Sequence, residues 1–377
     1  MFRSSFFYII CFLLFSCREM GSGAYLGILL LGSPAGGSVA TGIWKKRLPI
    51  SFDNTGRGQL VNFPATIRLT AARVDFSLIQ DNGADIRFYS EDMETLLKHE
   101  LVWFDPVQEK AEMQVLVPQI AAGTSTDRIY MLYNNETAAD GQQASALWSN
   151  YTAVYHLSEG SGQYLDSTGD HSSTSVTVTD RQNTEGIAGG PAPVFSNHEI
   201  QLGNWNVSPA GPGNDGLTME MFLKFNSFAT SDGRLLTKST SFVSDADHTW
   251  AISTFGGGPH YLRARIRTAG TTTAILDSDV TGPLASGTWY HIVSTYDDTT
   301  GKVYLNGNLV ESAAFTGLLD QDARSIVVGR HPDGSRPLDG VMDELRIAPF
   351  AVSEDFLDAT NESFRDSMQS YGAVENL

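Results

Sequence analysis

Acidic side chains are the first residues of this chain whose type and spacing could support chemistry. Hydrolysis of a glycosidic bond with retention needs two carboxylates about 5–5.5 Å apart. A strand presents two acids on one face only when they alternate, because neighbouring side chains point to opposite faces. The nearest acidic pair on an expected strand is Asp343 and Glu344, which are adjacent in sequence. We therefore expect no glycosidase-type pair, and we predict that the protein is not an enzyme.

Other catalytic motifs are missing from the sequence. No G-x-S-x-G, H-E-x-x-H or Walker loop occurs, and the glycine run 256–258 lies in an expected hairpin without phosphate-binding context. The two cysteines, Cys11 and Cys17, both lie in the first seventeen residues. A disulfide framework, a cysteine-based zinc site and thiol catalysis are therefore excluded from the folded part.

The charge of the chain limits its partners. It carries 43 acidic and 25 basic residues, and its formal net charge is −18. Such a surface repels nucleic acid and anionic lipid headgroups, so we expect no nucleic-acid partner. Loops rich in Asp are also suited to divalent cations.

The N-terminus has the pattern of an export signal. Arg3 precedes an apolar run over 6–15, and residues 14–17 (Leu-Phe-Ser-Cys) resemble a bacterial lipobox. We predict that 1–16 form a signal peptide, that Cys17 is lipidated, and that 17–43 form a flexible tether. An ordinary signal peptide and an uncleaved anchor are the alternatives. The expected location is the bacterial cell envelope, as an outer-membrane lipoprotein or otherwise secreted, with membrane contact through the anchor only.

Short segments with period-two alternation, separated by turn clusters, follow from Trp44 onward. They predict an all-β chain of two antiparallel β-sandwich (jelly-roll) domains in tandem. The polar, Ala-rich connection 134–149 marks the boundary. The expected domains are 44–140 and 150–352, followed by a C-terminal tail, 353–377, with a short helix after Ser353.

Six phrases between 153 and 350 resemble the laminin-G-like (concanavalin A-like lectin/glucanase) jelly roll. They are V-Y-H-L-S-E-G-S-G from 154, D-S-T-G from 166, L-T-M-E-M-F from 217, W-Y-H-I-V from 289, V-Y-L-N-G from 303 and G-V-M-D-E-L-R-I from 340. Members of that family often bind a structural calcium ion between the opening turn and the closing strand. By position, the resemblance implies that Glu159, Asp166 and Asp343 bind Ca²⁺. The alternative is that these acids accept backbone N–H bonds in turns.

The first half resembles a second family, the bacterial domain of unknown function numbered 2341. The matching phrases are W-K-K-R-L-P-I from 44, F-P-A-T-I-R-L from 63, D-N-G-A-D-I-R-F from 81 and I-Y-M-L-Y-N-N from 129. That family has no assigned chemistry and often precedes laminin-G-like domains on bacterial surfaces. The resemblance therefore implies an architecture and no activity.

Sugar binding would need exposed aromatic rings and polar side chains on loops. Four aromatic residues in or beside expected loops are candidates, although each could instead be a packing residue: Trp148, Tyr164, Trp205 and Tyr261. His156 and His291 are expected to be packed or hydrogen-bonded residues of the sandwich. The leading hypothesis is a non-catalytic surface binding or adhesion protein for carbohydrate or extracellular protein. A structural envelope scaffold and a cryptic glycoside hydrolase are the alternatives.

Overall fold

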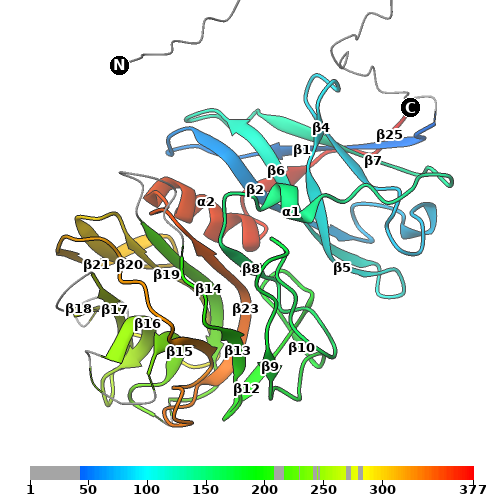
Figure 1. The fold of residues 1–377 in the computed structure, drawn as a ribbon. Coiled ribbons are helices and arrows are strands. Elements are labelled where there is room, and N and C mark those ends of the chain that lie inside the picture. Colours follow the sequence, from blue (N-terminus) through cyan, green and yellow to red (C-terminus); the bar gives the residue numbers. More distant parts are fainter. Residues whose placement is uncertain are drawn as a thin grey trace, which may run out of the picture. The chain divides into compact units, whose positions relative to one another are not determined.

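The computed structural model describes residues 43–207, 216–228, 230–240, 244, 247–268, 273–278 and 283–377. The predicted signal peptide, Cys17 and nearly all of the tether lie outside these residues. No helix within the described ranges is long and apolar enough to cross a membrane. Residues Ser38–Leu377 cluster as one compact unit, which holds two sandwich-like regions built from antiparallel sheets (Figure 1). The all-β prediction is confirmed.

The first sandwich consists of two sheets. Along their strands, apolar residues that face the core alternate with more polar residues that face away from it. Leu48, Ile50 and Phe52 of β1 are buried in its core, as are Ile67 and Leu69 of β2. One sheet has the order β24-β1-β7-β3-β4, with β25 also paired to β1, and contains β1 (Lys46–Phe52), β3 (Arg87–Ser90), β4 (Leu96–Leu97), β7 (Arg128–Tyr133), β24 (Gln369–Tyr371) and β25 (Glu375–Asn376). The other has the order β2-β6-β5 and contains β2 (Leu60–Thr70), β5 (His99–Asp105) and β6 (Lys110–Ile120). A short 3₁₀ helix, η1 (Phe76–Leu78), follows β2.

The second sandwich also has two sheets. The sheet that carries the closing strand has the order β12-β23-β14-β19-β20-β21, with β8 also paired to β23, and contains β8 (Ala153–Tyr155), β12 (Val194–Ser196), β14 (Leu217–Phe225), β19 (Trp289–Tyr296), β20 (Thr300–Leu305), β21 (Asn308–Ala314) and β23 (Asp339–Ala348). The facing sheet contains, in order, β18 (Thr273–Asp277), β17 (Tyr261–Arg267), β16 (His248–Phe255), β15 (Arg234–Ser239), β22 (Ser325–Val328), β13 (Ile200–Gly203) and β9 (Ser175–Val176). A small hairpin, β10 (Thr184–Glu185) and β11 (Pro191–Ala192), stands beside them.

Strand β14 shows why the sequence pattern places charged residues on the outer face of the closing-strand sheet. Met219, Met221 and Leu223 belong to the core of the second sandwich. The residues between them, Glu220 and Phe222, therefore point away from that core. The turn from β20 to β21 has the geometry that Asn-Gly favours, because both of its central residues have positive φ: 53° at Asn306 and 79° at Gly307.

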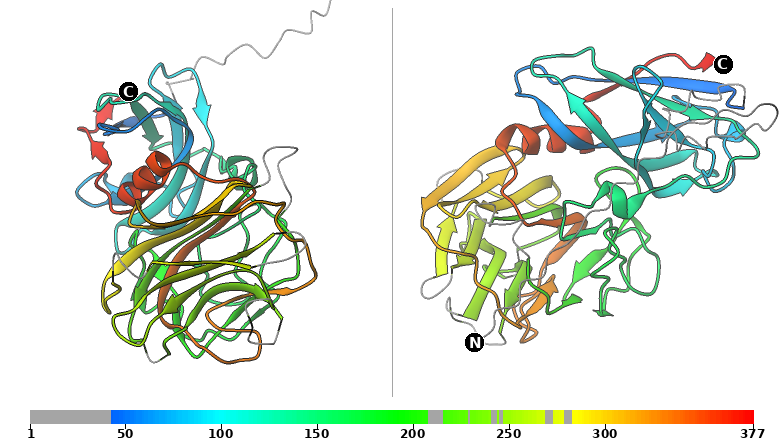
Figure 2. Two further views of the ribbon diagram at one scale, coloured as in Figure 1. Left: turned by 90° about the vertical axis from the view of Figure 1, so that its left-hand side faces the viewer. Right: turned by 45° about the horizontal axis from the view of Figure 1, so that its top comes forward.

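The C-terminal segment, expected to be a tail, belongs to the first sandwich. Helix α2 (Glu354–Phe364) follows Ser353 as expected and packs on β2. Strands β24 and β25 then pair with β1, and both views of Figure 2 show these red strands beside the blue first strand. Met368 and Ala359 are buried in the first core. The last 25 residues are therefore a structural part of a sandwich whose other strands lie more than 220 residues earlier.

The connection expected over 134–149 combines exposed residues with a buried end. It contains a short helix, α1 (Ala144–Leu147), and Leu147 and Trp148 are buried in a small apolar cluster with Val154 of β8. The apolar residues at the end of this polar segment thus join the two sandwiches.

Candidate functional site

The three residues predicted to bind calcium are separate acceptors of backbone bonds. Asp166 is buried and accepts the N–H groups of Val154 at 2.9 Å, Thr168 at 3.0 Å and His171 at 2.9 Å. Glu159 accepts the N–H of Leu165 at 2.7 Å. This is the turn arrangement that the sequence left open as the alternative.

Asp343 is also buried, and its Oδ2 accepts the N–H of Ile187 at 2.8 Å. Within the described ranges, no three His, Cys, Asp or Glu residues form a group that could hold a metal ion. The structure therefore does not bring Glu159, Asp166 and Asp343 together, because each carboxylate is directed to its own backbone partner. Binding of Ca²⁺ by these residues stays a prediction.

The four aromatic candidates do not form a sugar-binding face. Trp148 and Tyr164 are fully buried, as expected for the packing residues that the sequence allowed as the alternative, so neither ring is open to a sugar. Trp148 is held inside because its ring packs on Tyr151 and its Nε1 donates to Glu100. Trp205 is half-buried and stacks on His171 with ring centroids 4.5 Å apart. Tyr261 is half-buried at the start of β17.

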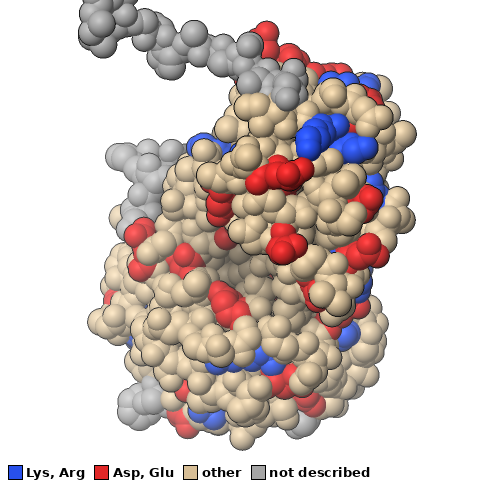
Figure 3. Space-filling model, turned by 90° about the vertical axis from the view of Figure 1, so that its right-hand side faces the viewer, with Lys and Arg blue, Asp and Glu red and all other residues tan. Residues whose placement is uncertain are grey.

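A polar groove with a volume of about 260 Å³ lies between the β5–β6 hairpin and the segment around the β10–β11 hairpin. Its first wall carries Trp103, Asp105, Gln108 and Lys110, and its second wall comprises residues 182–185 and 189–191. Figure 3 shows the side of the molecule that carries these elements, where the surface is hollowed and acidic side chains border the hollow. We call this feature the Trp103 groove.

The side chains of the Trp103 groove can offer both stacking and hydrogen bonds. Trp103 is half-buried, so part of its ring is accessible. Amide side chains come from Gln108 and Gln182, and a salt bridge of 3.1 Å between Lys110 and Glu185 crosses the groove. One partly exposed indole beside amide side chains, a salt bridge and the carboxylate of Asp105 matches a hydroxyl-rich ligand without negative charge.

A close approach of backbone to side chain shapes the floor of the groove. A β-carbon placed on Gly190 would lie 3.4 Å from Cβ of Trp103 and 3.2 Å from Oε2 of Glu112. The preceding Gly189 has φ of 99°, a conformation that favours glycine. The two glycines thus allow the second wall to lie directly against Trp103 and over the buried Glu112.

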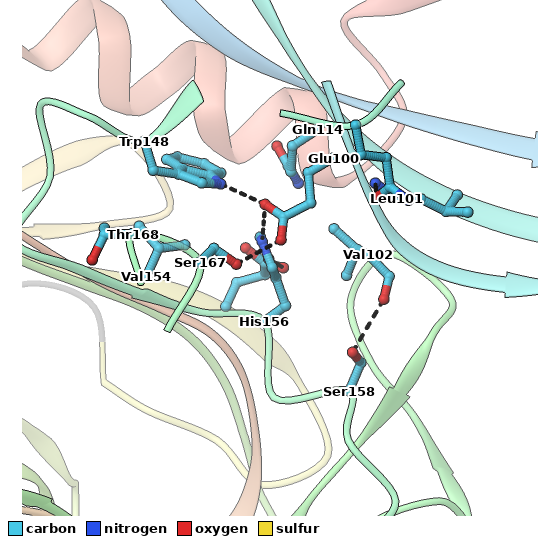
Figure 4. A network of polar contacts seen from close by, with 12 residues as sticks. Glu100, Leu101, Val102, Gln114, Trp148, Val154, His156, Ser158, Ser167 and Thr168 are labelled. Atoms are coloured by element: carbon cyan, nitrogen blue, oxygen red, sulfur yellow. Dashed lines mark hydrogen bonds and ion pairs between the residues drawn. The ribbon is translucent and has the colours of Figure 1, made fainter. Parts of the chain in front are cut away.

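A buried hydrogen-bond network beside the groove links the two sandwiches (Figure 4). Glu100 of β5 accepts from Nε1 of Trp148 at 2.7 Å, from Oγ of Ser167 at 2.6 Å, and lies 3.1 Å from Nε2 of His156. On the other side of its ring, Nδ1 of His156 lies 2.5 Å from Oε1 of Glu344. Glu344 also accepts from Arg346 at 2.9 Å. Four charged groups thus form one chain across the interface.

The pKa values of these groups are shifted in the directions that the contacts dictate. Burial disfavours the ionised form of Glu100, but the charge and hydrogen bond of His156, with the bonds from Ser167 and Trp148, lower its pKa to about 2. Burial also opposes the charge on His156, yet Glu344 and Glu100 raise the pKa of His156 well above 6.5. His156 therefore carries its proton at neutral pH.

Two further acids beside this network have raised pKa values, in contrast to the lowered pKa of Glu100. Burial, reinforced by the negative charge of Glu344, raises the pKa of Glu112 to about 8. Burial and the charges of Glu112 and Glu344 raise the pKa of Asp343 well above its usual value. Both shifts favour the protonated form of these acids, and a protonated Asp343 is a weak ligand for a cation.

The outer face of the closing-strand sheet carries a second contact between a histidine and a glutamate. Nε2 of His291 lies 2.8 Å from Oε1 of Glu220, and both side chains are buried. Phe222 stacks on His291, and Phe364 of α2 packs on Phe222. The helix therefore covers this part of the sheet, and the expectation that His156 and His291 are hydrogen-bonded packing residues is confirmed.

Sequence reasoning missed Trp103, Lys110 and Glu100. Each lies in the first half of the chain, where no chemistry is assigned to the resembling family. A weak signal was present: Trp103 lies in H-E-L-V-W-F-D, a strand with an acid at each end, followed directly by the turn P-V-Q-E. What makes these residues a site is the segment 182–191, and no local pattern predicts that pairing.

Comparisons with known proteins agree with this architecture. Residues 196–356 match the model of the concanavalin A-like lectin/glucanases superfamily, and residues 82–172 match the domain of unknown function numbered 2341. Both resemblances expected from the sequence are confirmed. The second match continues through α1 and β8, beyond the expected boundary. No curated protein matches the chain.

Several solved structures align with part of the chain at low identity. Domain 4 of AbnA, a GH43 extracellular arabinanase from Geobacillus stearothermophilus in complex with arabinotriose, is 22% identical, with 56% of this chain and 98% of that chain covered and a TM-score of 0.41. The binding domain of Paraclostridial Mosquitocidal Protein 1 is 14% identical, with coverage of 59% and 53% and a TM-score of 0.44. A SAP-like pentraxin from Limulus polyphemus is 14% identical, with coverage of 46% and 82% and a TM-score of 0.31. Likeness at this level concerns the fold alone.

Proposed function

The chain carries a concanavalin A-like lectin/glucanase domain preceded by a domain of unknown function, and from this premise we propose that it is a non-catalytic surface protein that binds carbohydrate. The observation that supports this proposal is the Trp103 groove. Its half-buried indole and its amide and carboxylate side chains are the groups with which proteins hold sugar rings. Both sandwiches contribute residues to this groove, so the ligand would contact residues of both.

A glycan array tests the proposal. The detergent-solubilised full chain should give reproducible signals on uncharged oligosaccharides, and arabinotriose, xylotriose and cellotriose are suitable first probes in solution. A blank array from a folded protein would favour an envelope scaffold without a specific ligand. Release of reducing sugar from a polysaccharide would favour a glycoside hydrolase instead.

The cellular location is part of the same proposal. Residues 14–17 support a lipid anchor at Cys17 in the bacterial envelope, which would hold the groove outside the membrane. The variant Cys17→Ala should move the protein from the membrane fraction to the soluble fraction. Unchanged fractionation, or a mature N-terminus other than Cys17 by mass spectrometry, would contradict the anchor.

A further inference from the structure

The ring of His156 lies between two carboxylates from different sandwiches. Nε2 lies 3.1 Å from Glu100 of β5, and Nδ1 lies 2.5 Å from Glu344 of β23. A neutral imidazole has one N–H donor and one lone pair, so it can satisfy only one of two carboxylates. With both acids ionised, the two contacts are satisfied at once only by the imidazolium ion. The geometry then places a proton on each ring nitrogen.

Few groups near His156 could replace its positive charge. Its side chain is only 7% exposed and that of Glu344 is fully buried, so water cannot replace a lost partner at the centre. From the first sandwich, Glu100 and, at longer range, Glu112 face the ring; from the second, Glu344 does so directly, and Asp343 and Glu159 lie at longer range. Arg346 donates to Glu344. The two direct neighbours are acids from different sandwiches, so a positive ring attracts both sides of the interface.

The same few residues connect the ring to both walls of the Trp103 groove. Glu100 and Trp103 lie on one strand, β5. Two residues after His156, Ser158 donates its hydroxyl to the carbonyl of Val102 at 3.2 Å. The carbonyl of Ser158 accepts from Nε2 of Gln182 at 3.0 Å, and Gln182 lies on the second wall. The position of each wall therefore depends on the segment that carries His156.

We propose that the protonated ring of His156 is a clamp that holds the two walls of the Trp103 groove together, and that the walls separate when the ring loses its proton. His156 is thus a positioning residue of the groove. Loss of the proton leaves one carboxylate facing a ring lone pair in a buried site, which favours separation of β5 from the segment that follows β8. This clamp can be tested without any carbohydrate.

Histidine NMR and hydrogen exchange measure the two halves of the proposal. In the ¹⁵N-histidine-labelled full chain in detergent, we expect both ring nitrogens of His156 to be protonated at pH 8. Amide exchange over residues 99–112 and 182–191, corrected for the intrinsic effect of pH, should accelerate above the pH at which His156 titrates. A singly protonated His156 at pH 7, or exchange in both walls that does not change with its titration, would overturn the clamp.

The variant Glu100→Gln gives a second test. Its result should not change if His156 has a purely structural role. It keeps hydrogen-bond acceptors of similar shape but removes one of the two charges beside the ring. We expect the titration of His156 and the onset of fast exchange to move together to lower pH, by roughly one to three units. The matched control is Glu136→Gln, an acid of the first sandwich whose side chain is 83% exposed. An unchanged titration in Glu100→Gln, or an equal shift in the control, would reject the proposal. A protein that keeps this titration behaviour but gives a blank glycan array would reject only the proposed function.

Discussion

Nε2 of His156 lies 3.1 Å from Oε2 of Glu100, although the two residues are 56 positions apart and belong to different sandwiches. This contact joins the opening of the second sandwich to the strand that carries Trp103. It makes the two halves of the chain one structural unit at the point where the groove lies.

Replacing Trp103 with Ala should weaken binding of any oligosaccharide that the protein recognises. Loss of the stacking ring should cost about 1.5 kcal/mol, roughly a tenfold rise in the dissociation constant. Isothermal titration with the best array ligand measures this. Trp44→Ala is the matched control, because Trp44 is a half-buried tryptophan of the first sandwich that does not line the groove. Equal affinity of Trp103→Ala and the unmodified protein would show that the ligand binds elsewhere.

The stability of the protein should fall at both ends of the pH range because of Glu100 and His156. The pKa of Glu100 is lowered from 4.5 to about 2, so its contribution is present above pH 4.5 and lost as pH falls towards 2. That contribution is up to about 3 kcal/mol. The raised pKa of His156 acts in the opposite direction: its contribution is complete below pH 6.5 and is lost as pH rises through the folded-state value.

Thermal unfolding from pH 2 to 10 measures both effects. The maximum Tm contributed by this pair should lie between about pH 5 and 6.5. The variant Glu100→Gln should flatten the acidic side of the curve, because it removes the group that titrates there. An acidic side that is equally steep in the variant would mean that other carboxylates determine it.

Asp166→Ala should destabilise the second sandwich strongly, with or without calcium. The carboxylate accepts four backbone N–H groups and the hydroxyl of Thr168 at 2.5 Å, and its removal leaves these donors without their acceptor. We expect a loss of about 3 kcal/mol by chemical denaturation, and a smaller loss for Asp166→Asn, which keeps an acceptor oxygen. Asp170→Ala, an exposed acid in the same turn, should change stability by less than about 0.5 kcal/mol. Equal effects of the two alanine variants would contradict this role.

Asp343→Asn should raise the Tm at pH 7 in the presence of chelator. The folded-state pKa of Asp343 lies well above 3.8, so its contribution to stability is complete below pH 3.8 and declines as pH rises above that value. Asparagine removes this loss and can still accept the N–H of Ile187. Differential scanning fluorimetry with calcium and with chelator checks the result. A calcium-dependent rise in Tm that the variant abolishes would instead support the predicted calcium site.

Removing residues 365–377 should unfold the first sandwich more readily than the second. The truncation deletes β24 and β25, the ion pair of Arg73 with Asp366 and the buried Met368. Loss of one buried Met side chain alone costs about 2–5 kcal/mol in other proteins. Hydrogen exchange of β1 and β7 should therefore accelerate. Deletion of 375–377, which removes only β25, is the control and should change little.

The sequence predicted the fold because short strands with period-two alternation and turn residues are local features. Leu48, Ile50 and Phe52 face the first core as their alternation predicts, and Asn306-Gly307 forms the expected turn. Helix α2 follows Ser353 at the expected place. The resemblance of 154–162 and 340–347 to one family rests on short sequence phrases in a fixed order. Such phrases can be recognised from the sequence without a structure.

The candidate site was decided by tertiary structure. Alternation shows that a side chain leaves its own core, but not which other surface covers it. For this reason Trp148 and Tyr164 were expected in loops and are buried, and Trp103 was not expected to line a groove with residues 182–191. The ionisation of His156 and Asp343 depends on acids that lie as far apart in sequence as Glu100 and Glu344, because electrostatic energy depends on distance in space and on burial. The chain by itself determined the strands, their turns and their family; the packing of one sandwich against the other determined the groove and the charges beside it.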